Sequence, residues 1–148
     1  MTDAPVLPSH AYVPGHTARH TEGAFDPIRA SVREGMSSKE LARTEAFRAG
    51  LAFRASGHFW EAHEVLEPVW MACPPNSEPR AFVQAIIQLA NAQLKLRMGK
   101  PRAATRLCQI ALAHLDEVRG EVVLGCDVAA LRVEVLALST SSELQYNA

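Results

Sequence analysis

A histidine and three glutamates crowd one short segment of the chain, EAHEVLE. In a helix, the four-residue spacing of His63 and Glu67 places them one turn apart, on the side of the segment that carries Trp70. A histidine held by a carboxylate can move a proton or bind a ligand. The same pair is also common as a hydrogen-bonded structural pair, so both interpretations stand. Glu64 lies further round this face, and Glu61 is expected to point more nearly outward.

A second group of polar residues forms a row of amides later in the chain. Gln84, Gln88, Asn91 and Lys95 fall within about 60° of one another at the helical period. Solvent strips usually contain more Glu, Lys and Arg, so successive amides favour partial burial opposite a polar partner. An unpaired buried amide costs on the order of 1–3 kcal/mol. We expect this row to face His63 and its acidic neighbours across a helix–helix contact, with a solvent-facing strip as the alternative.

Helices are expected to position both groups. A short helix is predicted over 26–33, followed by five longer ones over 37–56, 58–72, 77–98, 101–119 and 127–138. Gly57 and Gly99 are expected to join helical hairpins. No strand is predicted, because the β-branched clusters are short and no Asn-Gly or Asp-Gly turn occurs. The predicted fold class is all-α, a compact bundle of about five helices rather than a solenoid, since only two similar hairpins occur.

Within that bundle, two helices have distinctive sequences. The segment 77–98 is apolar around most of its circumference, which predicts a helix at the centre of the domain. In the segment before it, Pro68 lacks a backbone N–H. The carbonyl of Glu64 therefore loses its usual partner, and the helix should bend or tighten there.

The chain divides into three predicted parts: an irregular arm over 1–24, a single helical domain over 25–140 and a polar tail over 141–148. Prolines and glycines break any regular period in the arm, which contains His10, His16 and His20. We expect Tyr12 and the three residues after it to lie against the domain. A wholly disordered arm is the alternative.

Composition excludes several classes of protein. Fifteen Lys and Arg residues against sixteen Asp and Glu give the 148-residue chain a formal net charge of −1, which argues against a nucleic-acid-binding protein. No apolar run reaches the roughly 18 residues needed to cross a bilayer, so no membrane partner is predicted. The odd number of widely spaced cysteines (Cys73, Cys108 and Cys126) suits reduced thiols in a cytoplasmic protein.

The motifs resemble a known family. The pattern G-x-F-x-E-A-H-E-x-L-E-x-x-W from Gly57, followed by F-x-Q-x-x-I-Q-L-A from Phe82, resembles domain of unknown function 309 over about residues 45–116. The resemblance implies a small all-helical cytosolic protein and no established activity. The polar positions of the pattern are Glu61, His63, Glu64, Glu67, Gln84 and Gln88. The chain departs from it at Pro68, at Asn91 and at Lys95, which stands where histidine is often seen and cannot ligate a metal.

The candidate polar site therefore consists of Glu61, His63, Glu64, Glu67, Trp70, Gln84, Gln88, Asn91 and Lys95. We expect a structural, interaction or regulatory role, with a homo-oligomer or another protein as partner. The alternative is a small-ligand-binding protein or a hydrolase-like enzyme that uses His63 and Glu67. A metal is a further alternative, but the His-Glu-x-x-His motif fails at Glu67 and Glu-x-x-His fails at Trp60. No cofactor is predicted.

Overall fold

Seven helices and one small hairpin make up the computed structural model, which describes residues 4–147. The elements are α1 (Asp26–Arg29), α2 (Ser38–Arg43), α3 (Glu45–Ala55), α4 (Phe59–Ala72), α5 (Glu78–Arg97), α6 (Pro101–Leu115), β1 (Val122–Val123), β2 (Cys126–Asp127) and α7 (Val128–Asn147). The all-α prediction is confirmed. In the described part of the chain, no helix is long and apolar enough to cross a membrane.

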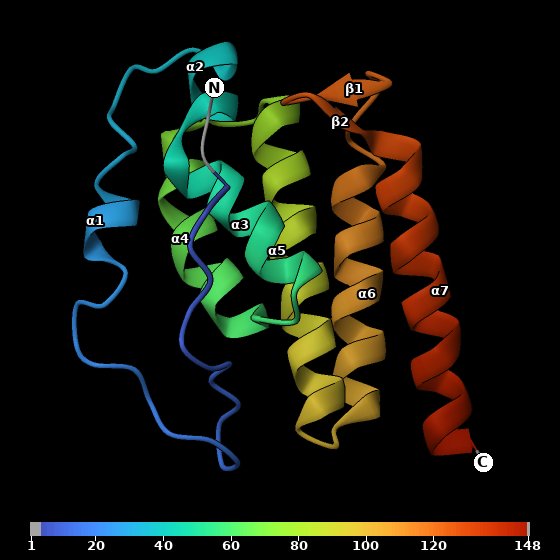
Figure 1. The fold of residues 1–148 in the computed structure, drawn as a ribbon. Helices are drawn as coiled ribbons and strands as arrows, with labels where there is room; N and C mark the ends of the chain where they lie inside the picture. Colours follow the sequence, from blue (N-terminus) through green and yellow to red (C-terminus); the bar gives the residue numbers. More distant parts are fainter. Residues whose placement is uncertain (1–3, 148) are drawn as a thin grey trace.

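The longer helices follow one another as antiparallel neighbours, and α5 lies at the centre with α4 and α6 on either side (Figure 1). The apolar circumference of α5 explains this position, since Phe82, Ile86 and Leu89 are each about 1% exposed. Each large side chain buried there contributes roughly 1.5–3 kcal/mol. The prediction that this segment forms the central helix is confirmed.

The single helix predicted over 37–56 is wrong, because the chain breaks at Thr44. Thr44 has extended backbone (φ −65°, ψ 150°), and its Oγ1 accepts a hydrogen bond from the N–H of Phe47. The same hydroxyl donates to the carbonyl of Leu41 at 2.7 Å. One side chain thereby ends α2 and begins α3, which lets the two helices run in different directions.

The prediction of no strand is also wrong over a short stretch. Val122 pairs with Asp127, and Val123 with Cys126, in an antiparallel ladder. Leu124 and Gly125 form the turn with φ of 51° and 75°. Two successive positive φ angles are typical of a tight hairpin turn. The turn was missed because leucine precedes the glycine here, where Asn or Asp is usual.

The C-terminal helix is longer than predicted. Helix α7 continues to Asn147, through residues that were expected to form a polar tail. Ser142 is fully buried and its hydroxyl lies 2.6 Å from that of Thr105 on α6. Polar side chains at the helix–helix contact made this segment look like a tail in the sequence.

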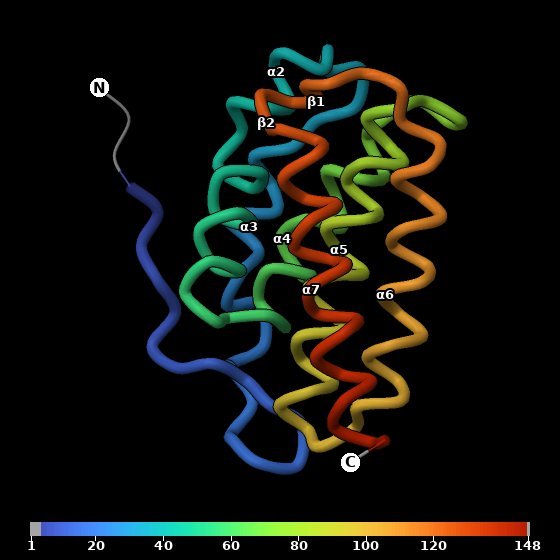
Figure 2. Tube along the Cα trace, turned by 90° about the vertical axis from the view of Figure 1, so that its right-hand side faces the viewer, coloured from blue at the N-terminus to red at the C-terminus, as the bar shows by residue number. Residues whose placement is uncertain are grey.

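The N-terminal arm packs against the helices, as its Tyr12–Gly15 portion was expected to do. Figure 2 shows the arm descending along the outer side of α3 and turning beneath the helices before it rises to α1. Val13 is 8% exposed and is the arm's only buried residue within 4–24. Its carbonyl accepts the N–H groups of His16 and Thr17, which closes a turn.

Candidate functional site

Glu61 is fully buried, which corrects the expectation that it points outward. Val65 and Val69 follow it at one-turn intervals on α4 and are also fully buried. The same helical period would have placed Glu61 on the apolar face, but its position three residues before Glu64 suggested otherwise.

The arm supplies both hydrogen-bond partners of Glu61. The backbone N–H of Tyr12 donates to Glu61 Oε2 at 2.7 Å, and His20 Nε2 lies 2.5 Å from the same oxygen. The His20 side chain is only 8% exposed. Glu61 Oε1 is buried and has no partner among residues 4–147. Sequence reasoning missed this role of His20 because 41 residues separate it from Glu61.

Aromatic rings surround this buried pair. His20 stacks on His10 with ring centroids 4.3 Å apart and meets the ring of Phe25 edge-on at 5.0 Å. Tyr12 meets Trp60 of α4 edge-on at 5.2 Å. The arm is therefore attached to α4 by one buried carboxylate and a cluster of rings.

The second acidic residue of the motif, Glu64, faces α1 through Arg29. Arg29 Nη1 donates to the Glu64 carbonyl oxygen, the group that Pro68 deprives of its helical partner. Arg29 also lies 3.9 Å from the Glu64 carboxylate and 3.4 Å from that of Glu67. The prediction that Pro68 deprives the Glu64 carbonyl of its usual helical partner agrees with this contact, and α4 continues through Pro68 as one helix.

His63 and Glu67 form a half-exposed pair. Nε2 of His63 lies 3.6 Å from Glu67 Oε2, and the two side chains are 34% and 40% exposed. A one-turn pair of this kind stabilises a helix by only about 0.3–0.5 kcal/mol. Both side chains are accessible from solvent, and the Glu67 carboxylate also forms an ion pair with Arg29.

The amide row lies along α5, half-buried. All four of its side chains are partly buried: Gln84, Gln88, Asn91 and Lys95. Within residues 4–147 the three amides make no hydrogen bond. They therefore keep free donors and acceptors at a partly water-excluded surface.

The register of α4 against α5 is given by a contact at one end of both helices. The guanidinium of Arg97 lies 4.5 Å from the ring centroid of Phe59, so the end of α5 meets the beginning of α4. Within residues 4–147, no hydrogen bond or ion pair joins His63 or Glu67 to the amide row, so the expected contact between the two groups stays a prediction.

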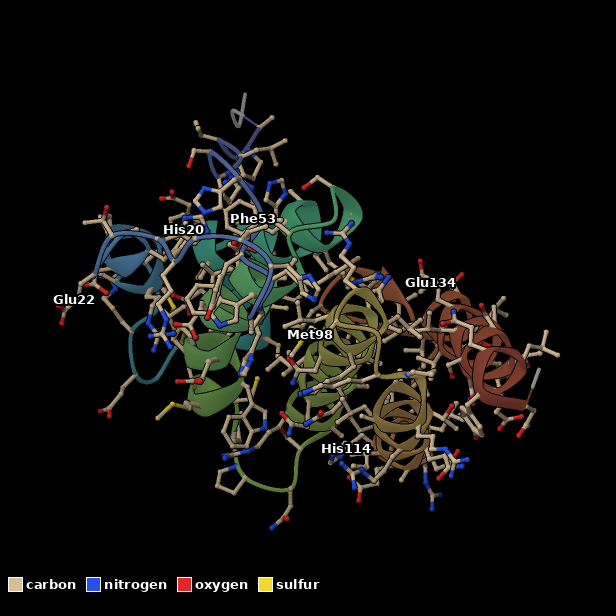
Figure 3. All side chains as sticks on the ribbon, turned by 90° about the horizontal axis from the view of Figure 1, so that it is seen from below. His20, Glu22, Phe53, Met98, His114 and Glu134 are labelled. Carbon is tan, nitrogen blue, oxygen red and sulfur yellow. The ribbon has the colours of Figure 1, made fainter. Side chains whose placement is uncertain are left out.

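A cavity of about 200 Å³ lies at the other end of this row. It is lined by Trp70 of α4, Gln84 and Arg80 of α5, and His114 of α6. The Arg80 guanidinium lies 4.5 Å from the Trp70 ring centroid. Figure 3 shows His114 on the side of α6 that faces α4. Of the predicted site residues, this cavity brings together Trp70 and Gln84.

Comparison with known families bears on this arrangement. Residues 47–107 match the family model described as Domain of unknown function (DUF309). This segment is therefore similar to the DUF309 family, as its motifs indicated. No curated protein and no solved structure matches the chain.

The DUF309 segment begins in α3 and ends in α6, so it contains α4, α5 and all nine predicted site residues. It covers less than half of the chain. The arm residues Tyr12 and His20, which hold Glu61, lie outside it, as does Arg29. The buried carboxylate of the DUF309 segment is thus hydrogen-bonded by residues outside the matched region.

The cysteines lie away from both polar groups. Burial raises the pKa of the Cys73 and Cys108 thiols to about 11, and it also raises the pKa of Cys126. All three are free thiols. Among the described residues, no group of three or more His, Cys, Asp or Glu side chains is arranged to hold a metal ion.

Proposed function

We propose that the protein is an interaction module that binds an extended segment of a partner protein along α5, between α4 and α6. The observation that carries the proposal is the row Gln84, Gln88 and Asn91, whose half-buried amides have no partner within residues 4–147. A cytoplasmic location is part of this proposal, supported by the three free thiols.

A carboxamide is chemically matched to a peptide backbone. It has both an N–H donor and a C=O acceptor, so one Gln or Asn can pair with both groups of a peptide unit. A partner held in this way is recognised mainly by its main chain. Its side chains then need only avoid clashing with α4 and α6.

The spacing of the row suits an extended segment. Successive members of the row are about one helical turn apart, close to 5.4 Å. An extended chain presents the same edge every two residues, about 6.6–6.8 Å. The flexible Gln side chains can absorb this difference over three positions, which fits a bound segment of about six residues.

The cavity beside Trp70 supplies an anchor for one partner side chain. Its volume of about 200 Å³ and its Trp70–Arg80 stack suit a single apolar or aromatic group. Buried aromatic and arginine residues commonly carry most of the free energy of a protein interface. At the far end of the row, Lys95 supplies a positive charge.

Selection of displayed random peptides on the full-length protein tests the proposal. The best peptide is then titrated against the wild type and against a Gln84→Ala, Gln88→Ala, Asn91→Ala variant. We expect the variant to weaken binding at least about 100-fold, since three hydrogen bonds of roughly 1 kcal/mol each are lost. The matched control is Gln109→Ala, an exposed amide on α6, which should leave affinity unchanged.

Backbone methylation of the peptide provides a second criterion. N-methyl groups on alternate residues along one edge should abolish binding, whereas methylation along the other edge should be tolerated. The proposal is wrong if the triple alanine variant binds as the wild type does, or if no peptide is selected. Self-association that the same three substitutions abolish would identify the partner as a second copy of the chain.

A further inference from the structure

A second, larger cavity lies between the arm, α1 and α4. Its volume is about 590 Å³, within the range of small-molecule sites. His20 lies at its inner wall, and rings of Tyr12, Phe25 and Trp60 also line it. This cavity is separate from the α5 row and shares no lining residue with the cavity beside Trp70.

A buried histidine, His20, lines the cavity and has two ring nitrogens in different surroundings. Nε2 of His20 points to Glu61, at 2.5 Å. Nδ1 has no hydrogen-bond partner within residues 4–147, and the His20 side chain is 8% exposed. With Nε2–H donating to Glu61, Nδ1 of a neutral ring is a hydrogen-bond acceptor directed away from the carboxylate.

The charges around the cavity favour a cation. Three carboxylates and two guanidinium groups line it, and the buried Glu61 carboxylate lies directly behind His20. Arg29 is already engaged with Glu64 and Glu67, and the Arg19 guanidinium lies over the Tyr12 ring at 5.9 Å.

The remaining two carboxylates are unpaired. Glu22 and Asp26 are exposed at the rim, and their side-chain carboxylates have neither a hydrogen bond nor an ion pair within the described range 4–147. Figure 3 shows His20 between the arm and the helices and Glu22 on the outer side of the arm loop. A ligand in the cavity would therefore meet an acceptor at its inner wall and negative charge at its rim.

We propose that this cavity binds a small organic amine. The ammonium group donates hydrogen bonds to His20 Nδ1 and is attracted by Asp26 and Glu22. The carbon body of the ligand packs on the rings of Trp60 and Phe25, whose faces also attract cations. Arg19 moves off the Tyr12 ring toward solvent as the amine enters.

The test compares two probes of the same size and opposite charge: phenethylamine and 3-phenylpropionate. Both are titrated into the full-length Trp70→Phe variant, in which Trp60 is the only tryptophan. We expect phenethylamine to change the Trp60 fluorescence and to bind at least about tenfold more tightly than the acid. Equal binding of the two probes, tighter binding of the acid, or unchanged fluorescence with the amine would overturn the proposal.

Variants of the rim locate the bound amine. Glu22→Gln with Asp26→Asn should weaken phenethylamine binding about fivefold to tenfold. Glu34→Gln, an exposed carboxylate outside the cavity, is the matched control and should have no effect. The ¹⁵N resonance of His20 Nδ1 should shift on titration with the amine in the wild-type protein. If the rim variant binds as the wild type does, or if this resonance stays unchanged, the amine is not held here.

Discussion

A single buried carboxylate joins the arm to the rest of the protein. Glu61 Oε2 accepts from the Tyr12 backbone and faces His20 Nε2, and both partners come from a segment with little other buried surface. Arm docking should therefore depend on this one side chain more than on any surface contact.

The variant Glu61→Gln tests that dependence. The amide removes the negative charge that faces His20, so we expect stability to fall by about 1–3 kcal/mol. The arm should also open locally, which would expose the peptide bond after Arg19 to trypsin. Urea unfolding and timed proteolysis measure the two effects. Glu22→Gln serves as the control, and cleavage at the wild-type rate would show that the arm is held by other contacts.

Arg29 and Pro68 should be energetically coupled. Arg29 donates to the Glu64 carbonyl only because Pro68 cannot. In a Pro68→Ala background the helix supplies its own donor to this carbonyl. Arg29→Ala should then destabilise that background less than it destabilises the wild type, by about 0.5–1.5 kcal/mol. A double-mutant cycle from urea denaturation measures this difference, and simple additivity would refute the coupling.

The cysteines should be unreactive at neutral pH. Burial raises the pKa of Cys73 and Cys108 to about 11, so at pH 7 both remain protonated thiols. Because the thiolate is the reactive form, labelling should accelerate as pH rises toward 11. Cys126, which is partly exposed, should react first. Thiol labelling followed by peptide mapping reports the order, and rapid labelling of Cys108 in the folded protein at pH 7 would contradict it.

At the scale of elements, α3 and α4 approach closely at Gly50. A Cβ atom added at Gly50 would overlap the side chain of Leu66, closer than van der Waals contact allows. Both residues are buried at this crossing, and Leu66 is fully buried. The glycine is therefore kept for close packing, although it is a poor helix former.

Gly50→Ala should destabilise the protein even though alanine favours a helix by about 1 kcal/mol over glycine. We expect a net loss of about 1–3 kcal/mol, since overpacking forces a backbone shift. In a Leu66→Ala background, Gly50→Ala should destabilise the protein less, or should stabilise it. Thermal and urea unfolding of the wild type, the two single variants and the double variant give the sign of each change in stability. A Gly50→Ala variant more stable than the wild type would show that α3 can move away from α4 freely.

The helices and the central place of α5 could be predicted from the sequence, because hydrophobic periodicity reports burial along one helix. The break at Thr44 could not, because the threonine cap lies inside a continuous helical pattern. The hairpin at Leu124 and Gly125 lacked its usual residues, and the last turns of α7 are too polar to suggest a packed helix.

Prediction of the polar residues succeeded only where the contact is local. The spacing of His63 and Glu67 indicated a one-turn pair, and they lie 3.6 Å apart, although half-exposed. The contact of Glu61 with His20 joins residues far apart in the chain, and no local pattern encodes it. Such contacts depend on the path of the arm, which is set by the packing of the whole molecule.

At the scale of the whole molecule, the polar groups on the two sides of α4 differ in their hydrogen bonding. The arm, outside the DUF309 segment, covers one side of α4 and hydrogen-bonds its buried carboxylate, Glu61. On the other side of α4, toward α5 and α6, the amides of the row have no hydrogen-bond partner within residues 4–147. The central claim is that these amides pair with the main chain of a bound segment.

Side-chain NH₂ resonances in ¹H–¹⁵N NMR spectra test that claim most directly. The full-length protein is titrated with its selected peptide while the amide signals of Gln84, Gln88 and Asn91 are followed, with Gln109 as the reference. We expect the side-chain signals of the three row residues to shift together and to saturate at one affinity, while the Gln109 signal stays unchanged. Row signals that remain fixed while the peptide binds would contradict it.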